Sequence, residues 1–226
     1  MRKILIIEDE PEVVDLVALN LRTHGKFVVS VAPDGVSGLR MAREKVPSLI
    51  ILDLMLPGMS GFEICRLLKT DCATEQIPIV ILSARASAAD RIFGFELGAD
   101  DYITKPFSPR ELAMRVNALA QSEKYECTGV QELTAGPVLI SNREHEVSVG
   151  GRKVSLTAIE FKLLTHFIQT RGRVQSRDLL LQEVWEYAGS VTTRTVDAHI
   201  QRLRKKLGLE RDLIETVRTY GYRFRS

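Results

Sequence analysis

Three carboxylates stand where apolar runs of the sequence end, and together they could bind a metal ion. Glu8 and Asp9 follow the run at 3–7, and Asp53 follows the run at 49–52. If these runs are neighbouring parallel strands, their carboxyl ends meet at one edge of a sheet. Three like charges repel one another there, so the cluster requires a cation. Oxygen ligands without histidine or cysteine favour Mg²⁺ or Mn²⁺ over zinc.

A hydroxyl and an ammonium group join the carboxylates at the same expected edge. Ser83 ends the apolar run that starts at residue 77, and Lys105 follows the run at 102–104. Metal, lysine and hydroxyl together suit a planar, highly charged phosphoryl group in transfer to an oxygen of Asp53. A single acidic residue at a strand end is usually only a solvated loop residue. Five polar residues at the ends of four strands indicate a site.

The elements that must position these residues alternate between strand and helix signals five times over the first 120 residues. Amphipathic stretches separate the apolar runs, and the stretch at 11–24 carries Val13, Val14, Val17 and Leu21 on one face. Near-continuous apolar runs fit strands that are buried on both faces. The pattern predicts a doubly wound α/β fold with a five-stranded parallel sheet.

The alternation stops at residue 121, which we take as the end of a first domain at 1–121. A polar stretch with two glycines predicts a linker at 122–135, followed by a second domain at 136–226. Weak alternation at 138–154 around Gly150-Gly151 indicates a hairpin. The rest of the chain then predicts a small α+β domain. Its helical segments lie at 157–170, 176–186 and 193–208, and its short closing strands lie at 213–218 and 222–225.

Composition and charge exclude several classes of protein. With 45% hydrophobic and 27% charged residues, the chain is not disordered, collagen-like or of low complexity. No apolar run approaches the roughly 18 residues of a membrane span, and no signal peptide is evident. The three cysteines, Cys65, Cys72 and Cys127, match no CxxC spacing and fit a reducing cytosol. We therefore expect a cytoplasmic protein without a membrane partner.

The two halves of the chain differ in charge. Residues 1–120 carry 14 Lys+Arg against 16 Asp+Glu, a net charge of −2, and the remainder carries 17 against 13, a net charge of +4. From Arg152 onward the count is 15 against 8, a net charge of +7. A basic last third predicts a polyanionic partner for the second domain.

The segment at 193–208 has the two faces expected of a DNA-reading helix. Val196, Ile200, Leu203 and Leu207 form one apolar stripe. The opposite face carries Arg194, Ala198, Gln201, Arg202 and Lys205. Cations around a slim alanine suit the major groove, although an exposed basic helix with salt bridges remains the alternative. The closing hairpin adds the features of a wing that reaches the DNA backbone or minor groove, namely Thr216, Arg218, Tyr222, Arg223 and Arg225.

Four motifs of the first domain carry a resemblance to a known family. They read IIEDE at 6–10, LDLMLPG at 52–58, LSA at 82–84 and GADDYITKPF at 98–107. With them, residues 1–120 resemble the receiver domain of bacterial two-component response regulators, which has a flavodoxin-like fold. The resemblance implies that Asp53 accepts a phosphoryl group from a sensor histidine kinase.

The same resemblance assigns the neighbouring residues. Glu8 and Asp9 would hold Mg²⁺ with Asp53 and the backbone carbonyl of Met55. Lys105 would pair with the phosphoryl oxygens through a geometry that a cis Lys105–Pro106 bond sets, and Ser83 would bond the same group. Tyr102 resembles the aromatic switch that turns inward when Ser83 moves; the alternative is a half-buried strand tyrosine without a switching role.

A dense run of charges at 91–115 resembles the face through which the OmpR/PhoB branch of response regulators dimerises on activation. Such a run is usually only a solvated face. The resemblance implies intersubunit ion pairs and an apolar centre; the residues are Arg91, Ile92, Phe93, Asp100, Asp101, Glu111, Leu112, Ala113 and Arg115. Arg91 would pair with Glu111, and Asp101 with Arg115. The basic partner that Asp100 usually has just past the last helix is missing here.

The second domain resembles the winged-helix effector domain of the OmpR/PhoB branch. The matching stretches are LTAIEFKLL at 156–164, SRDLL at 176–180, VW at 184–185, RTVDAHI at 194–200, LRKKL at 203–207 and GYRF at 221–224. The resemblance implies base contacts by Arg202 and Arg204, a wing contact by Arg218, and an RNA polymerase contact by the loop at 186–190. It assigns phosphate contacts to Trp185, Arg194, Thr195, Thr216 and Tyr222, with a core tryptophan as the alternative for Trp185. Gln201 and Thr219-Tyr220 depart from the family pattern.

Together these observations predict a response regulator that is phosphorylated on Asp53, forms a homodimer and binds tandem half-sites of promoter DNA to regulate transcription. No enzymatic activity is expected beyond the self-catalysed phosphoryl transfer. One alternative is a dimeric transcription factor that works without phosphorylation. A distant alternative is a Mg²⁺-dependent phosphotransfer enzyme, which would need a second catalytic acid two residues after Asp53, where Met55 stands.

Overall fold

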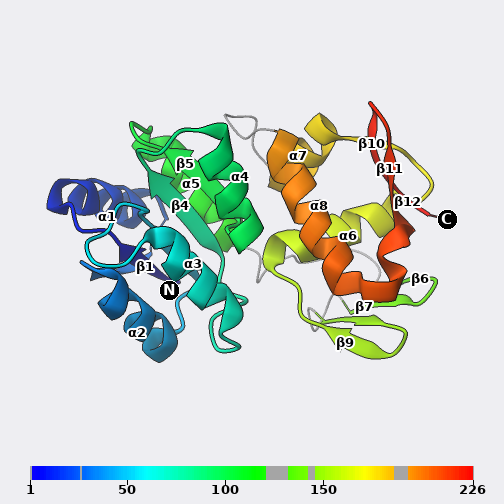
Figure 1. Cartoon of the computed structure of the whole chain (residues 1–226), viewed down its shortest axis with the longest axis horizontal. Helices are drawn as coiled ribbons and strands as arrows, with labels where there is room; N and C mark the ends of the chain where they lie inside the picture. The colour runs from blue at the N-terminus through cyan, green and yellow to red at the C-terminus, as the bar shows by residue number, and fades with distance from the viewer. Residues whose placement is uncertain (1, 26, 121–131, 142–145, 186–192, 226) are drawn as a thin grey trace. The chain divides into compact units, whose positions relative to one another are not determined.

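The computed structural model describes residues 2–25, 27–120, 132–141, 146–185 and 193–225, without the side chains of residues 24, 25, 193 and 194 (Figure 1). The chain divides into two compact units, Met1–Gln121 and Ser122–Ser226. None of the described helices is both long and apolar enough to cross a bilayer. The predicted linker at 122–131, Cys127 and the predicted polymerase loop at 186–190 lie outside the described residues.

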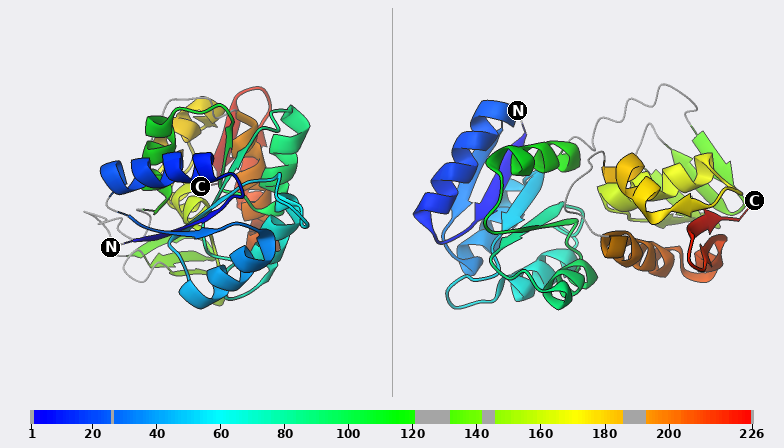
Figure 2. Two further views of the ribbon diagram at one scale, coloured as in Figure 1. Left: turned by 90° about the vertical axis from the view of Figure 1, so that its left-hand side faces the viewer. Right: turned by 90° about the horizontal axis from the view of Figure 1, so that it is seen from above.

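The first unit contains a parallel sheet of five strands in the order β2-β1-β3-β4-β5. The strands are β1 (Lys3–Ile7), β2 (Val28–Ala32), β3 (Leu49–Leu52), β4 (Ile79–Ser83) and β5 (Asp101–Thr104). The helices are α1 (Pro11–Gly25), α2 (Gly35–Lys45), α3 (Gly61–Thr70), α4 (Ala88–Leu97) and α5 (Pro109–Ala120). α1 packs on α5 at one face of the sheet, while α2, α3 and α4 follow one another across the other face (Figure 2). The doubly wound fold predicted from the sequence is confirmed.

The second unit begins with an antiparallel sheet in the order β6-β7-β8-β9. Its strands are β6 (Glu132–Ala135), β7 (Val138–Ser141), β8 (Glu146–Val149) and β9 (Arg152–Val154). β6 occupies the last four residues of the predicted linker at 122–135, so the prediction extended the linker four residues too far. The signal was weak because only one residue of this short edge strand, Ala135, is buried.

Three helices and a second sheet complete this unit. They are α6 (Ala158–Gln169), β10 (Gln175–Ser176), α7 (Arg177–Trp185), α8 (Thr193–Leu207), the 3₁₀ helix η2 (Gly208–Leu213), β11 (Ile214–Val217) and β12 (Gly221–Phe224). The strands pair in the order β10-β12-β11. The predicted stripe of α8 is buried against α6 and α7, and Val196, Ile200 and Leu203 have no exposed surface. The winged helix-turn-helix α+β fold is confirmed.

Candidate phosphoacceptor site and nucleic-acid interface

Two buried carboxylates lie side by side at the carboxyl edge of the parallel sheet. β1 and β3 pair in register from Ile4 to Ile7, and the N–H of Asp53 extends this pairing by donating to the carbonyl of Ile7 at 3.0 Å. The N–H of Glu8 donates to Ala32 of β2 in the same way, at 3.1 Å. Both side chains are only 2% exposed. The topology therefore brings together two residues that are 45 positions apart in the sequence.

Lys105 connects these carboxylates to β5. Its N–H donates to the carbonyl of Ser83 at 2.8 Å, and the Lys105–Pro106 peptide bond is cis, as the resemblance implied. The ammonium Nζ donates to Glu8 Oε2 and Asp53 Oδ2, each at 2.8 Å, and to Glu10 Oε1 at 3.1 Å. Residues from β1, β3 and β5 thus converge on a single cation.

The carboxylates outnumber the cation that holds them. Burial raises the pKa of Glu8 to about 7; Asp53 adds to the rise, and the Lys105 hydrogen bond opposes it. Burial alone would lower the pKa of Lys105, but its hydrogen bonds to Asp53, Glu8 and Glu10 outweigh burial and raise it. The cluster is therefore short of positive charge, which is the environment that a hard divalent cation fits.

The set of converging carboxylates differs from the predicted one. Oxygen atoms of Glu8, Glu10 and Asp53 all lie within 4.8 Å of one another, whereas Asp9 is exposed and does not belong to this set. Glu8 is the first residue after β1, and the chain bends at Asp9, so that Glu10 reaches the cluster and donates its N–H to Glu8 Oε1 at 3.3 Å.

Met55 contributes a backbone group beside the acceptor oxygen. Its N–H donates to Asp53 Oδ1 at 3.1 Å, while its side chain is exposed. The two oxygens of Asp53 are therefore held separately, one by this amide and the other by Lys105.

Ser83 and Tyr102 are both buried and share a partner. The Ser83 hydroxyl accepts the N–H of Arg85 at 3.3 Å, and the Tyr102 hydroxyl donates to the carbonyl of Arg85 at 2.7 Å. Burial, with a further contribution from the charge of Asp90, raises the pKa of Tyr102 to about 12. The phenol therefore stays a neutral donor, and the backbone of Arg85 links the two predicted switch residues.

Three residues of the predicted dimer face are paired within the chain. Arg115 is buried and donates to both carboxylate oxygens of Asp101, at 3.0 and 3.1 Å. It also donates to Glu111 Oε1 at 3.0 and 2.5 Å. In this structure the predicted intersubunit partners Asp101 and Arg115 satisfy each other inside the domain.

Asp100 corrects the prediction that it lies at the dimer face. It is 0% exposed, and its Oδ2 accepts Lys69 Nζ at 3.2 Å and the N–H of Ile79 at 3.0 Å. The basic partner of Asp100 in this structure is thus a lysine of α3. Leu112 and Ala113, which were predicted near the apolar centre of that face, are also buried inside the domain.

The exposed part of that face is smaller. Arg91 and Ile92 of α4 are half-buried, and Phe93 is 47% exposed. The ring of Phe93 packs edge-on against Phe62 of α3, with centroids 5.0 Å apart.

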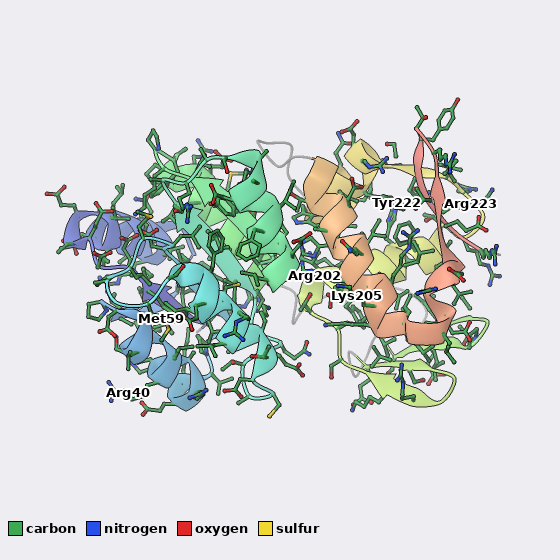
Figure 3. All side chains as sticks on the ribbon, in the orientation of Figure 1. Arg40, Met59, Arg202, Lys205, Tyr222 and Arg223 are labelled. Atoms are coloured by element: carbon green, nitrogen blue, oxygen red, sulfur yellow. The ribbon has the colours of Figure 1, made fainter. Side chains whose placement is uncertain are left out.

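α8 presents a polar face of the predicted kind. Gln201 and Lys205 are exposed and Arg202 is half-buried, and Figure 3 shows Arg202 and Lys205 projecting from the same side of the helix. Ala198, which was predicted on this face, is only 9% exposed. The side chain of Arg194 lies outside the described part of the chain.

Arg204 is turned away from the predicted base contact. Its guanidinium donates to the carbonyl of Ile214 at 2.6 and 3.0 Å and to Thr216 Oγ1 at 2.9 Å, and it lies 5.5 Å from the ring centroid of Tyr222. These bonds join α8 to β11. Sequence position alone could not show this, because the partners belong to the hairpin.

The phosphate contacts predicted for Trp185, Thr195 and Tyr222 fall on side chains that are buried in this structure. Trp185 packs edge-on against the buried ring of His199 at 5.2 Å, which matches the core alternative. The Tyr222 hydroxyl donates to Asp197 Oδ1 at 2.6 Å. Burial, followed by this hydrogen bond, raises the pKa of Tyr222 to about 12.

A basic groove of about 860 Å³ runs along the hairpin. Its cationic lining residues are Arg204, Arg211, Arg218, Arg223 and Arg225. Glu215 accepts hydrogen bonds from Arg223 and Arg225, which lower the pKa of its carboxyl. Figure 3 shows Tyr222 and Arg223 on opposite sides of β12, so the hairpin has one buried and one cationic face.

Comparison with known proteins joins the two sites in one family. The response regulator receiver domain matches residues 4–117, and the C-terminal domain of transcriptional regulatory proteins matches residues 151–224. The chain is 39% identical over 225 residues to the DNA-binding response regulator MtrA of Mycolicibacterium smegmatis, covering 98% of this chain and 96% of that protein. It is 39% identical over 234 residues to the transcriptional regulatory protein CseB of Streptomyces coelicolor, covering 99% and 97%.

Solved structures agree with these relatives. The response regulator DrrB of Thermotoga maritima, described as an OmpR/PhoB homologue, is 30% identical with a TM-score of 0.52, and the match covers all of both chains. A receiver domain with its carboxylate–lysine edge and a winged-helix DNA-binding domain thus occur in one chain. The chain belongs to the OmpR/PhoB family of response regulators and is a two-component regulator of transcription.

Proposed function

We propose that Asp53 is the phosphoacceptor and that a sensor histidine kinase supplies the phosphoryl group. The observation that carries this proposal is the ammonium of Lys105, which bonds Asp53 and Glu8 at 2.8 Å. A carboxylate oxygen of Asp53 attacks the phosphorus of the phosphohistidine. The new P–O bond forms as the P–N bond breaks, and the histidine nitrogen keeps the electron pair. Lys105 then neutralises charge on the transferred oxygens.

Mg²⁺ fits the donor set at this edge. The donors are carboxylate oxygens with no nitrogen or sulfur ligand among them, and one ammonium faces three carboxylates. Glu8, Glu10 and Asp53 would hold the ion, and the further ligands predicted from the sequence are Asp9 and the backbone carbonyl of Met55. When bound, the ion supplies positive charge that screens the incoming phosphoryl group from these carboxylates.

Ser83 and Tyr102 form the switch in this proposal. A phosphoryl group on Asp53 adds about −1.5 to −2 charges near the Ser83 hydroxyl. When that hydroxyl turns toward the new oxygens, it releases the N–H of Arg85, whose carbonyl holds Tyr102. One peptide segment thus transmits the change from β4 to the ring on β5.

The output is dimerisation through the face formed by α4, β5 and α5. Arg91, Ile92, Phe93 and Glu111 supply its accessible side chains. Asp101 and Arg115 take part only by exchanging the intrachain pair for an intersubunit pair, so the number of ion pairs stays constant. Phosphorylation then shifts an existing equilibrium between monomer and dimer and does not have to create new ion pairs.

The dimer places two winged helices on tandem half-sites. α8 would enter the major groove with Gln201, Arg202 and Lys205, and Arg218 of the hairpin would reach the adjacent backbone. The loop at 186–190 would contact RNA polymerase. A regulator that binds chromosomal DNA works in the cytoplasm, which we propose as its compartment.

Intact mass after incubation with acetyl phosphate and Mg²⁺ tests the first step. We expect one phosphoryl adduct on the wild-type chain and on Asp71→Asn, a half-buried carboxylate at the end of α3, but none on Asp53→Asn. A folded wild-type chain without an adduct would refute the phosphoacceptor and favour the dimeric factor that works without phosphorylation.

A further inference from the structure

The connection between β4 and α4 contains an arginine whose side chain contacts two helices. Arg85 lies in residues 84–87, between the end of β4 and the start of α4. Its Nε lies 3.1 Å from Asp90 Oδ1 on α4, and its Cζ lies over the ring of Phe62 on α3, 5.6 Å from the ring centroid. An ion pair and a cation–π contact thus attract the same guanidinium. Arg85 bridges α3 and α4, which pack against each other (Figure 1).

The two groups that attract Arg85 have further contacts of their own. Ser87 caps the start of α4: its hydroxyl donates to Asp90 Oδ2 at 2.5 Å and accepts the N–H of Asp90 at 3.0 Å. The ring of Phe62 packs edge-on against Phe93 of α4, with centroids 5.0 Å apart. The carboxylate and the ring are therefore restrained, and so is the guanidinium between them.

The backbone of the same residue makes both contacts of the proposed switch. The N–H of Arg85 donates to Ser83 Oγ at 3.3 Å, and its carbonyl accepts the hydroxyl of Tyr102 at 2.7 Å. Residue 85 belongs to neither a helix nor a strand, so regular backbone hydrogen bonding does not hold this peptide in place. Its position therefore depends on the side chain that it carries. The restraint on the guanidinium acts on the two hydrogen bonds that must break when Ser83 turns.

From these observations we infer that Arg85 is a positioning residue that holds the switch in its unphosphorylated state. Its ion pair with Asp90 and its contact with Phe62 keep the peptide of residue 85 where Ser83 and Tyr102 meet it. Phosphorylation works against this restraint, which lowers the fraction of active molecules before a phosphoryl group arrives. The inference rests on the proposed switch of Ser83 and Tyr102 and adds the side chain that sets its balance.

A second ion pair of the first unit provides a matched control. Arg43 Nε lies 2.6 Å from Asp71 Oδ2, and these side chains are 58% and 21% exposed, against 48% and 19% for Arg85 and Asp90. Exposed pairs of this kind contribute little to folding stability. The Arg43 pair joins α2 to the residue after α3, whereas the Arg85 pair flanks the switch peptide. Removing either arginine should cost similar stability, and only the loss of Arg85 should change the switch.

Fluorine NMR of the full-length chain labelled with fluorotyrosine tests this inference at Tyr102, whose signal is identified by its loss in Tyr102→Phe. Acetyl phosphate with Mg²⁺ gives the phosphorylated position of that signal. Without phosphate, we expect Arg85→Ala to shift the equilibrium about fivefold toward this position, the effect of one exposed ion pair and one cation–π contact. Arg43→Ala should leave the signal at the wild-type position. With phosphate, all three chains should share one position, because the ring has then left the peptide of Arg85.

A double variant tests whether Arg85 acts through its carboxylate partner. Asp90→Asn removes the partner charge and should shift the Tyr102 signal in the same direction. Arg85→Ala in that background should add less than it does alone, because the pair is already broken. Signals of Arg85→Ala and Arg43→Ala that coincide without phosphate would overturn the inference alone, and so would fully additive effects in the double variant. A wild-type chain that takes up no phosphoryl group, or whose Tyr102 signal stays in place when it does, would overturn the proposed switch and this inference together.

Discussion

Replacing Lys69 by methionine tests whether the buried carboxylate of Asp100 depends on one ammonium. Methionine keeps the apolar stem of the lysine and removes the charge. Lys69 Nζ bonds Asp100 Oδ2 and the carbonyls of Glu75 and Ile77, at 2.7 to 3.2 Å. In the variant, Asp100 keeps only the N–H of Ile79 as a partner among the described groups, and it remains fully buried.

The expected cost follows from this loss of partner. Removing one member of a buried ion pair costs about 3 to 5 kcal/mol. Because the N–H of Ile79 stays in place, we expect the lower end, about 3 kcal/mol of the unfolding free energy of the first unit. With a urea slope of about 2 kcal/mol per molar, the unfolding midpoint falls by about 1.5 M.

The assay has an internal control in the chain itself. The single tryptophan, Trp185, lies in the second unit, so its fluorescence in urea reports that unit and should not change. Far-UV circular dichroism reports both units and should show the earlier transition. The double variant Lys69→Met with Asp100→Asn removes the buried charge and should recover most of the loss. A loss below about 1 kcal/mol, or a double variant as unstable as the single one, would refute the reasoning.

Three further changes probe the two sites. Gly61→Ala should destabilise the first unit by about 2 to 3 kcal/mol and slow labelling by acetyl phosphate, because the new Cβ would lie 2.2 Å from the carbonyl oxygen of Asp53; urea unfolding and intact mass measure both effects. Hydrogen bonds from Arg223 and Arg225 lower the pKa of Glu215, so its carboxylate stabilises the folded unit at pH values above the ordinary glutamate pKa. This stabilisation is lost as pH falls through the lowered pKa. Glu215→Gln should flatten that acid-side loss, seen as Trp185 fluorescence against pH. Lys205→Ala should reduce the slope of log affinity against log salt by about one, measured by anisotropy.

Each of these three has a control and a contradicting result. Gly58→Ala, where nothing lies within 4 Å of the new Cβ, should cost only about 1 kcal/mol despite its positive φ; an equal cost at both glycines contradicts the steric argument. Glu183→Gln on α7 should keep the wild-type pH profile, and a flattened profile there would remove the special role of Glu215. Lys153→Ala on β9 should keep the full salt slope, and a parallel drop would show a general charge effect.

The sequence predicts the fold well where a strand is buried on both faces of the sheet. β3 and β4 are entirely buried, so their apolar runs have no polar interruption and their ends are easy to locate. The site follows from the same fact, since parallel topology brings Asp53 and Glu8 to one edge whatever lies between them. β6 escaped detection because an edge strand with only one buried residue has no such pattern.

Side-chain partnerships were harder to predict than positions. Asp100 and Lys69 are 31 residues apart, and neither helix periodicity nor a motif joins them. Arg204 lies on a helix whose charged residues look equivalent in the sequence, yet its guanidinium donates a hydrogen bond to Ile214 of the hairpin. Trp185 is buried by contacts with α8 that only the tertiary fold creates. These outcomes depend on which elements become neighbours, and a single sequence does not record that.

The bond network of Arg204 fixes the interval at which this protein can read its operators. With α8 and the hairpin joined into one body, the distance between the two stretches of groove they would touch is constant. A base substitution in a half-site then removes one contact and leaves the rest aligned. An inserted base pair instead rotates everything beyond it by about a tenth of a turn. On the proposed DNA contact, we therefore expect the operators of this regulator to vary more in base sequence than in spacing.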